Sequence, residues 1–82
     1  MNKIETEKLI KKQIEICEQR LDEKREICNR YSSIIMSVAY PNVIYPDVCE
    51  KYDIVRTEYE RLLHEREYLQ VQLLENKLKQ DK

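Results

Sequence analysis

The sequence contains no glycine, no phenylalanine and no tryptophan, and only two prolines among its 82 residues. Tight hairpin turns, phosphate-binding loops and bulged strands all depend on glycine, because it alone adopts positive backbone angles without steric cost. The absence of glycine therefore argues against a β-sheet and against a glycine-rich nucleotide loop. The composition favours a fold made of helices.

An excess of charge of one sign is also missing. Lys and Arg number 15 and Asp and Glu number 16, so the net charge is −1 although 38% of the residues are charged. Nucleic-acid-binding proteins usually carry a clear excess of basic residues, so nucleic acid is not the expected partner. The apolar runs are too short to cross a membrane, and the charged N-terminus lacks the apolar stretch of a signal peptide. We expect no membrane partner.

Three cysteines occur, an odd number, and none of them forms a Cys-x-x-Cys motif. A disulfide-stapled secreted domain usually has an even number of cysteines, so we expect reduced thiols and a cytoplasmic protein. The small size and the richness in Lys, Ile, Glu and Tyr suit an accessory protein of a phage or another mobile element.

In place of these features, the sequence has two ladders of mainly apolar residues whose positions alternate by four and three. The first ladder is Ile10, Ile14, Cys17, Leu21, Lys24, Cys28, Tyr31, Ile35 and Val38. The second ladder is Val48, Tyr52, Val55, Tyr59, Leu62, Arg66, Leu69, Leu73 and Asn76. This 3.5-residue period is typical of the seam of a coiled coil.

The two ladders flank a Tyr-Pro…Tyr-Pro segment at residues 40–46, where the chain is expected to reverse. Rungs whose numbers sum to 86 or 87, such as Val38 with Val48, would then face each other. The sequence predicts one all-α domain over 1–82, an antiparallel two-helix coiled-coil hairpin. Its expected parts are helix 1 at about 3–39, loop 40–46 and helix 2 at about 47–79, with Asn2 and Asp47 as N-caps. Because so short a chain buries little surface, we expect two hairpins to dimerise into a four-helix bundle.

Additional apolar residues lie off the seam near the open end of the expected hairpin. They are Leu9 and Ile16 on helix 1, and Val71, Leu74 and Leu78 on helix 2. Exposed apolar patches on a small protein usually mark contact surfaces, so these residues are predicted to bind a second copy or another protein. The alternative interpretation is loose packing at fraying helix ends.

The loop itself is apolar at Val43, Ile44 and Tyr45, where a solvated turn would be polar. Two interpretations stay open. Ile44 and Tyr45 could fold back and cover the end of the seam, or the loop tip could insert into a partner protein, for which rigid aromatic residues are efficient anchors.

Lys24 and Arg66 interrupt the two ladders. Polar seam residues commonly fix the register of a coiled coil, and their long side chains reach outward to nearby carboxylates. The alternative is an anion-binding site, which would make the protein a small regulator that binds an anionic ligand or nucleic acid. The basic open end could serve that alternative through its lysines, Lys8, Lys11, Lys12, Lys77, Lys79 and Lys82.

No group of residues with catalytic or metal-ligating spacing is found, so we expect neither an enzyme nor a cofactor or metal. His64 is the only histidine and falls at a solvent-facing heptad position, with no cysteine or aspartate placed to share a metal with it. The function that the sequence favours is that of a non-enzymatic protein–protein interaction module, an adaptor, inhibitor or assembly subunit. It would act through the loop tip or through an exposed apolar helix face.

Overall fold

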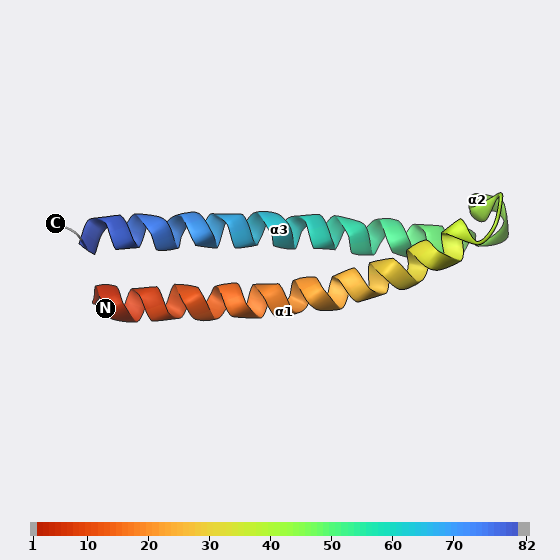
Figure 1. Cartoon of the computed structure of the whole chain (residues 1–82). Helices are drawn as coiled ribbons and strands as arrows, with labels where there is room; N and C mark the ends of the chain where they lie inside the picture. The colour runs from red at the N-terminus through yellow and green to blue at the C-terminus, as the bar shows by residue number, and fades with distance from the viewer. Residues whose placement is uncertain (1, 81–82) are drawn as a thin grey trace.

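The computed structural model describes residues 2–80, which form two long helices joined by a short connection. The helices are α1 (Lys3–Met36), α2 (Pro41–Ile44) and α3 (Pro46–Gln80). Figure 1 shows α1 and α3 side by side along a rod of 60 × 16 × 15 Å, with the chain reversing at α2. The prediction of an all-α antiparallel hairpin is confirmed. None of the helices between residues 2 and 80 is both long and apolar enough to cross a bilayer.

The first helix begins as predicted but ends early. The Oδ1 atom of Asn2 accepts a hydrogen bond from the Glu5 N–H at 2.8 Å, which confirms the N-cap. The helix then stops at Met36 rather than at residue 39. Ser37 donates both its hydroxyl, at 2.6 Å, and its N–H, at 3.2 Å, to the carbonyl oxygen of Ile34. These local bonds occupy a carbonyl that a continuing helix would use four residues later, so they favour termination.

The connection between the long helices is more ordered than the predicted loop. It contains the single helical turn α2, and both α2 and α3 begin with a proline, Pro41 and Pro46. Proline suits a first helical position because its missing N–H would have no partner there. The prediction that Asp47 caps the second long helix is therefore wrong. Asp47 lies inside the first turn, where its carboxylate faces the positive end of the helix dipole.

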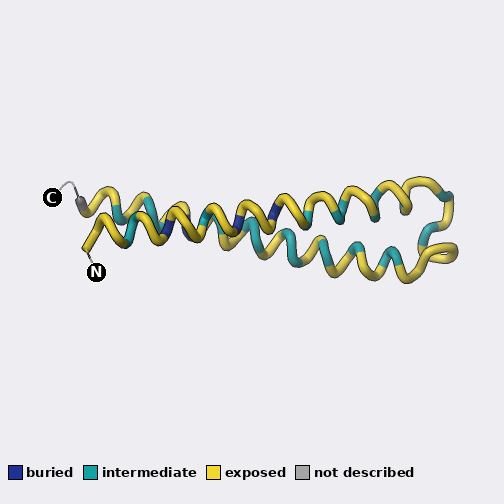
Figure 2. Tube along the Cα trace, turned by 90° about the horizontal axis from the view of Figure 1, so that it is seen from below, coloured by how far each residue is buried: buried dark blue, intermediate teal, exposed yellow. Residues whose placement is uncertain are grey.

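The core follows the two ladders. Every rung of both ladders is buried or half-buried, including the polar rungs Lys24, Arg66 and Asn76. The buried residues are Ile10, Cys17, Leu21 and Leu69, and Leu21 is the one fully buried among the described residues. Figure 2 shows them as dark blue segments confined to the half of the rod near the chain termini. The ladders were therefore correctly identified, and the half of the rod near α2 is less completely covered.

The register between the helices differs from the prediction. The side-chain contacts that join them midway are Cys17 Sγ to the Leu62 carbonyl oxygen at 3.2 Å, Lys24 Nζ to Glu58 Oε2 at 2.5 Å, and Arg25 Nη2 to the Tyr59 hydroxyl at 3.4 Å. These pairs of numbers sum to 79, 82 and 84, not to 86 or 87. The predicted pairing is thus wrong by one rung.

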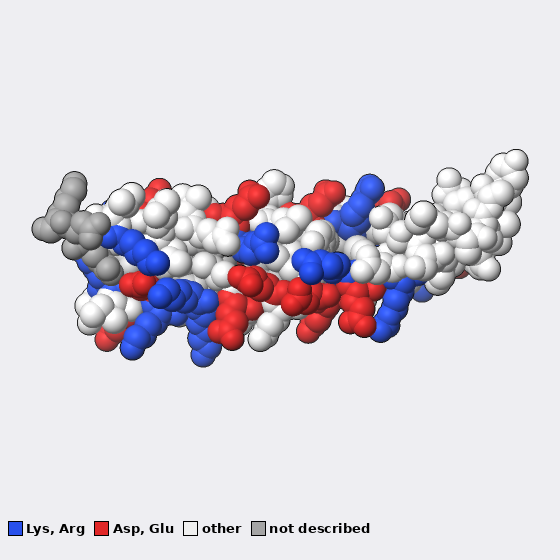
Figure 3. Space-filling model, in the orientation of Figure 1, with Lys and Arg blue, Asp and Glu red and all other residues white. Residues whose placement is uncertain are grey.

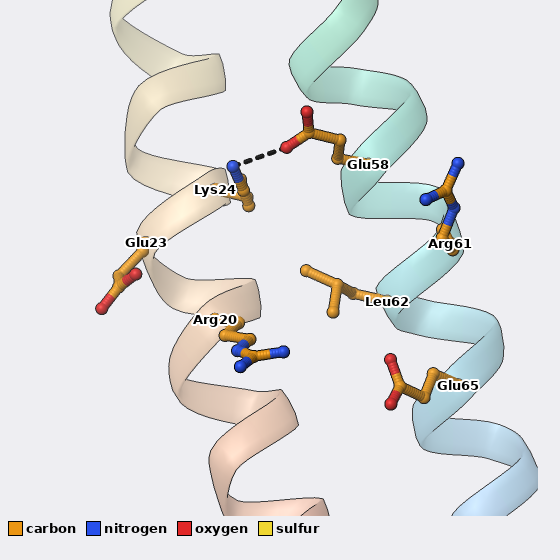
Figure 4. Close-up of a pocket in the computed structure, with 7 residues that line it drawn as sticks. All are labelled: Arg20, Glu23, Lys24, Glu58, Arg61, Leu62 and Glu65. Carbon is orange, nitrogen blue, oxygen red and sulfur yellow. Dashed lines mark ion pairs between the residues drawn. The ribbon is translucent and has the colours of Figure 1, made fainter.

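If residues whose numbers sum to 83 face each other, each rung of one ladder still meets a rung of the other, and Leu21 lies opposite Leu62. In Figure 4, Leu62 points toward α1 between the levels of Arg20 and Lys24, as this register requires. The physical reason is the connection. Because α1 ends three residues early, at Met36 rather than 39, and α2 forms a turn of its own, the chain reverses with a longer connection than the predicted loop.

Candidate functional site

The tip of the rod carries the loop residues that were predicted to bind a partner. Val43, Ile44 and Tyr45 are 79%, 53% and 40% exposed. A side chain that covered the end of the seam would lose most of its accessible surface. Val43 is therefore open to solvent and Ile44 is about half exposed, whereas Tyr45 has lost more than half of its accessible surface, so the fold-back interpretation applies in part to Tyr45.

The apolar tip is larger than the loop alone. From Tyr31 to Pro46, sixteen consecutive residues carry no charge, in a chain of which 38% is charged. Met36, at the end of α1, is 81% exposed, and Tyr40 is also exposed. Figure 3 shows this end of the rod free of charged side chains on the face that it presents. Met36 and Tyr40 were not identified from the sequence as contact residues, although the uncharged run from Tyr31 to Pro46 indicates them.

The apolar residues at the open end lie at the same level of the rod but on two different faces. Leu9 and Ile16 border the groove between the helices, where Leu9 lies with Gln72 and Asn76 of α3. A second set, comprising Val71, Leu74 and Leu78, is exposed on α3 and does not line that groove. The five predicted contact residues thus form two surfaces, and no single flat partner covers both.

The groove at mid-rod contains the predicted anion-binding residue Lys24, shown in Figure 4. Three cationic side chains line it, Arg20, Lys24 and Arg61, together with three carboxylates, Glu23, Glu58 and Glu65. Lys24 forms an ion pair with Glu58 across the helices. The charges in this groove balance, so its electrostatics do not favour an anion.

Arg66 is not among the residues that line that groove. It is half-buried, and its Nε atom is buried without a hydrogen-bond partner. The prediction placed Arg66 one rung from Lys24, opposite Leu21. The register places it opposite Cys17, two rungs from Lys24, so the structure does not bring the two predicted anion-binding residues together.

The most buried cysteine is a structural residue. The Cys17 thiol donates a hydrogen bond to the Leu62 carbonyl, and burial, aided by the carboxylate of Glu65, raises the pKa of the thiol. A thiol that stays protonated is a poor nucleophile and a poor metal ligand. Cys28 and Cys49 are half-buried, and all three cysteines are free.

The basic end of the rod is partly neutralised by its own groups. Lys11 pairs with Glu7 at 3.0 Å, and the ammonium of Lys3 donates to the carbonyl oxygen of Lys79. Lys82 lies outside the described residues. His64 is exposed near Glu67, and residues 2–80 contain no cluster of three or more His, Cys, Asp or Glu side chains placed to hold a metal ion.

Comparison with protein-family models, with curated proteins and with solved structures finds no match to this chain. The function of the chain is therefore inferred from its exposed surfaces.

Proposed function

We propose that this protein is a non-enzymatic protein–protein interaction module, an adaptor, inhibitor or assembly subunit, that binds a partner protein through the tip of its rod. The observation that carries this proposal is the exposed, uncharged end made by Met36, Tyr40, Val43, Ile44 and Tyr45. Contiguous apolar surface of this kind costs solubility, and proteins expose it mainly where a partner covers it.

The chemistry of the tip suits recognition of a protein. Tyrosine and methionine are enriched at protein interfaces, whereas lysine, glutamate and aspartate are depleted from interface centres. The tip is also held in shape, because α2 forms a helical turn between two prolines whose preceding peptide bonds are trans. A pre-ordered loop loses less conformational entropy on binding than a flexible one.

We further propose that two hairpins pair into a four-helix bundle in the cytoplasm. The described core contains only four buried residues, which is little for a chain of this size, and pairing would cover more apolar surface. The free state of the three cysteines supports a reducing compartment.

The tip proposal is tested by placing charge on it without disturbing the rod. The double variant Val43→Glu/Ile44→Glu changes two exposed side chains, and Leu78→Glu is the matched control at the opposite end. Each tagged protein is used to recover partners from its own cells, and the recovered partner is then purified and titrated against all three proteins by calorimetry. The proposal requires that the tip variant alone loses binding. Equal binding by the tip variant and the unmodified protein would refute it.

A further inference from the structure

A second ladder runs along α1 on the side that borders the groove. Its members are Leu9, Gln13, Ile16, Arg20, Glu23, Ile27, Arg30 and Ile34. Consecutive members of this ladder line consecutive grooves along the rod. Ile16 and Arg20 line one groove, and Arg20 and Glu23 line the next. Leu9, Ile16 and Ile34 are exposed, and Ile27 is half-buried. The hairpin itself leaves most of this apolar face uncovered.

The ladder has nearly the same chemistry when it is read in either direction, because only the pair of Gln13 and Arg30 differs in kind. Arg20 and Glu23 stand at its centre, with opposite charges. Moving outward, Ile16 matches Ile27, and Leu9 matches Ile34. Each of these three pairs of numbers sums to 43. A surface that is complementary to itself in the reversed direction is what a twofold interface between identical chains requires.

We propose that a second copy of this chain binds along this face, antiparallel to the first, with the twofold axis between Arg20 and Glu23. Arg20 of each copy then pairs with Glu23 of the other, twice by symmetry. On either side, Ile16 packs against Ile27 of the second copy, and Leu9 packs against Ile34. The assembly is a four-helix bundle with the two α1 helices in contact.

Charge selects the direction of this pairing. In a parallel arrangement the apolar residues would still meet, but Arg20 would face Arg20 and Glu23 would face Glu23. Like charges facing each other in a contact are destabilising, whereas the antiparallel arrangement turns both into reciprocal ion pairs.

The area of the face is close to the lower limit for a specific dimer. Leu9 to Ile34 spans 25 helical residues, about 38 Å at 1.5 Å per residue, and a helix is about 10–12 Å wide, which gives roughly 400 Å² per copy from α1 alone. Two exposed α3 residues widen the strip. Ile54 lines an adjoining groove with Glu58 and Arg61, and the hydroxyl of Tyr68 accepts a hydrogen bond from Gln72. The total approaches the ~1,000 Å² that a specific interface needs.

This geometry has a functional consequence. Ser37 of one copy lies at the level of Thr6 of the other, because these numbers also sum to 43. Because α1 of the other copy begins three residues before Thr6, at Lys3, the loop residues Val43, Ile44 and Tyr45 project past the start of that helix. The two tips point in opposite directions, so the dimer would hold two partner molecules at opposite ends. This consequence rests on the proposed function of the tip, whereas the pairing surface does not.

The decisive experiment is a charge exchange measured by sedimentation equilibrium under reducing conditions. Arg20→Glu alone and Glu23→Arg alone each place like charges across the twofold axis, so each variant should self-associate at least roughly tenfold more weakly than the unmodified 10.1 kDa chain. An equimolar mixture of the two variants should dimerise again, because each copy then supplies the charge that the other lacks. Mixing does not alter either hairpin internally, so recovery in the mixture separates contacts between copies from contacts within one.

A second pair of variants tests the apolar part of the face. Ile16→Asp should abolish the dimer, and Val71→Asp, on the other exposed face, should leave it intact; circular dichroism of both variants checks that the hairpin stays folded. A dimer that is unaffected by either single charge change, or a mixture that stays monomeric, would overturn this surface while leaving dimerisation itself in place. An unmodified chain that is monomeric at about 100 μM would overturn both. None of these results depends on binding by the tip.

Discussion

Replacing Leu21 by alanine is the most direct test of the core and its register. Leu21 is 1% exposed, the most completely buried side chain described, and the register places it opposite Leu62. The matched control is Leu74→Ala, because Leu74 is the same residue type within a helix but is 59% exposed. Both changes alter helix propensity equally, so the difference between them isolates the effect of burial.

The magnitude follows from the packing around Leu21. Leucine-to-alanine changes in protein cores cost about 2–5 kcal/mol, and the cost is lowest where the neighbours can move into the space that is left. Arg20, next to Leu21 in sequence, and Leu62, opposite it, both line an open groove, so they can move into the space that is left. We therefore expect a loss of about 3 kcal/mol in the free energy of unfolding. For a domain of this size the melting temperature should then fall by about 12–24 °C. The control should change stability by less than about 0.5 kcal/mol.

The assay is urea and thermal unfolding followed by circular dichroism at 222 nm, at one protein concentration for all variants. If Leu21→Ala cost less than about 1 kcal/mol, or if Leu74→Ala cost as much as Leu21→Ala, the assignment of Leu21 to the centre of the core would be wrong.

Other substitutions test the seam, the tip and the buried thiol. Leu62→Asp should abolish most of the helical signal, because it places an unpaired carboxylate in the middle of the seam; a variant that keeps full helicity would contradict the seam. Tyr45→Ala should cost less than about 1 kcal/mol if Tyr45 serves a partner at the tip, and a loss of about 1–3 kcal/mol would show that it covers the core. Cys17 should react with a thiol reagent more slowly than Cys28 and Cys49, which peptide mapping after partial alkylation measures. Because the pKa of Cys17 is raised above its ordinary value of 9.0, the unfolded chain loses this proton first as pH rises. Stability should therefore decline above about pH 9, and less so in Cys17→Ala; equal decline in both proteins would exclude Cys17 as the cause.

Local features of the hairpin followed from local signals. The absence of glycine and the 3.5-residue period were enough to predict two long helices, and every residue assigned to a ladder is covered in the structure. The cap at Asn2 was likewise readable, because capping depends on a side chain and an N–H only three residues apart. The end of α1 was not readable from Pro41 alone, since Ser37 terminates the helix before the proline is reached.

The nature of the tip was only partly visible in the sequence. Its apolar residues Val43, Ile44 and Tyr45 were identified, but whether they cover the seam or face solvent depends on the path of the chain through α2. The apolar face of α1 was identified only at Leu9 and Ile16. Ile27 and Ile34 continue it, and this becomes apparent once the grooves show which side of α1 the register leaves uncovered.

By itself, the sequence determined that this chain forms an antiparallel helical hairpin and which residues compose its seam, because helix formation and ladder spacing are set by residues within a few positions of one another. The tertiary structure alone decided the register, in which Leu62 lies between the levels of Arg20 and Lys24 rather than opposite Lys24, and the separation of the open-end residues onto two faces. The physical reason is the periodicity of the ladders. A ladder that repeats every three or four residues packs almost equally well when one helix is shifted along the other by one rung. Only the geometry of the connection, with α1 ending at Met36 and α2 turning before α3, selects one of these alignments.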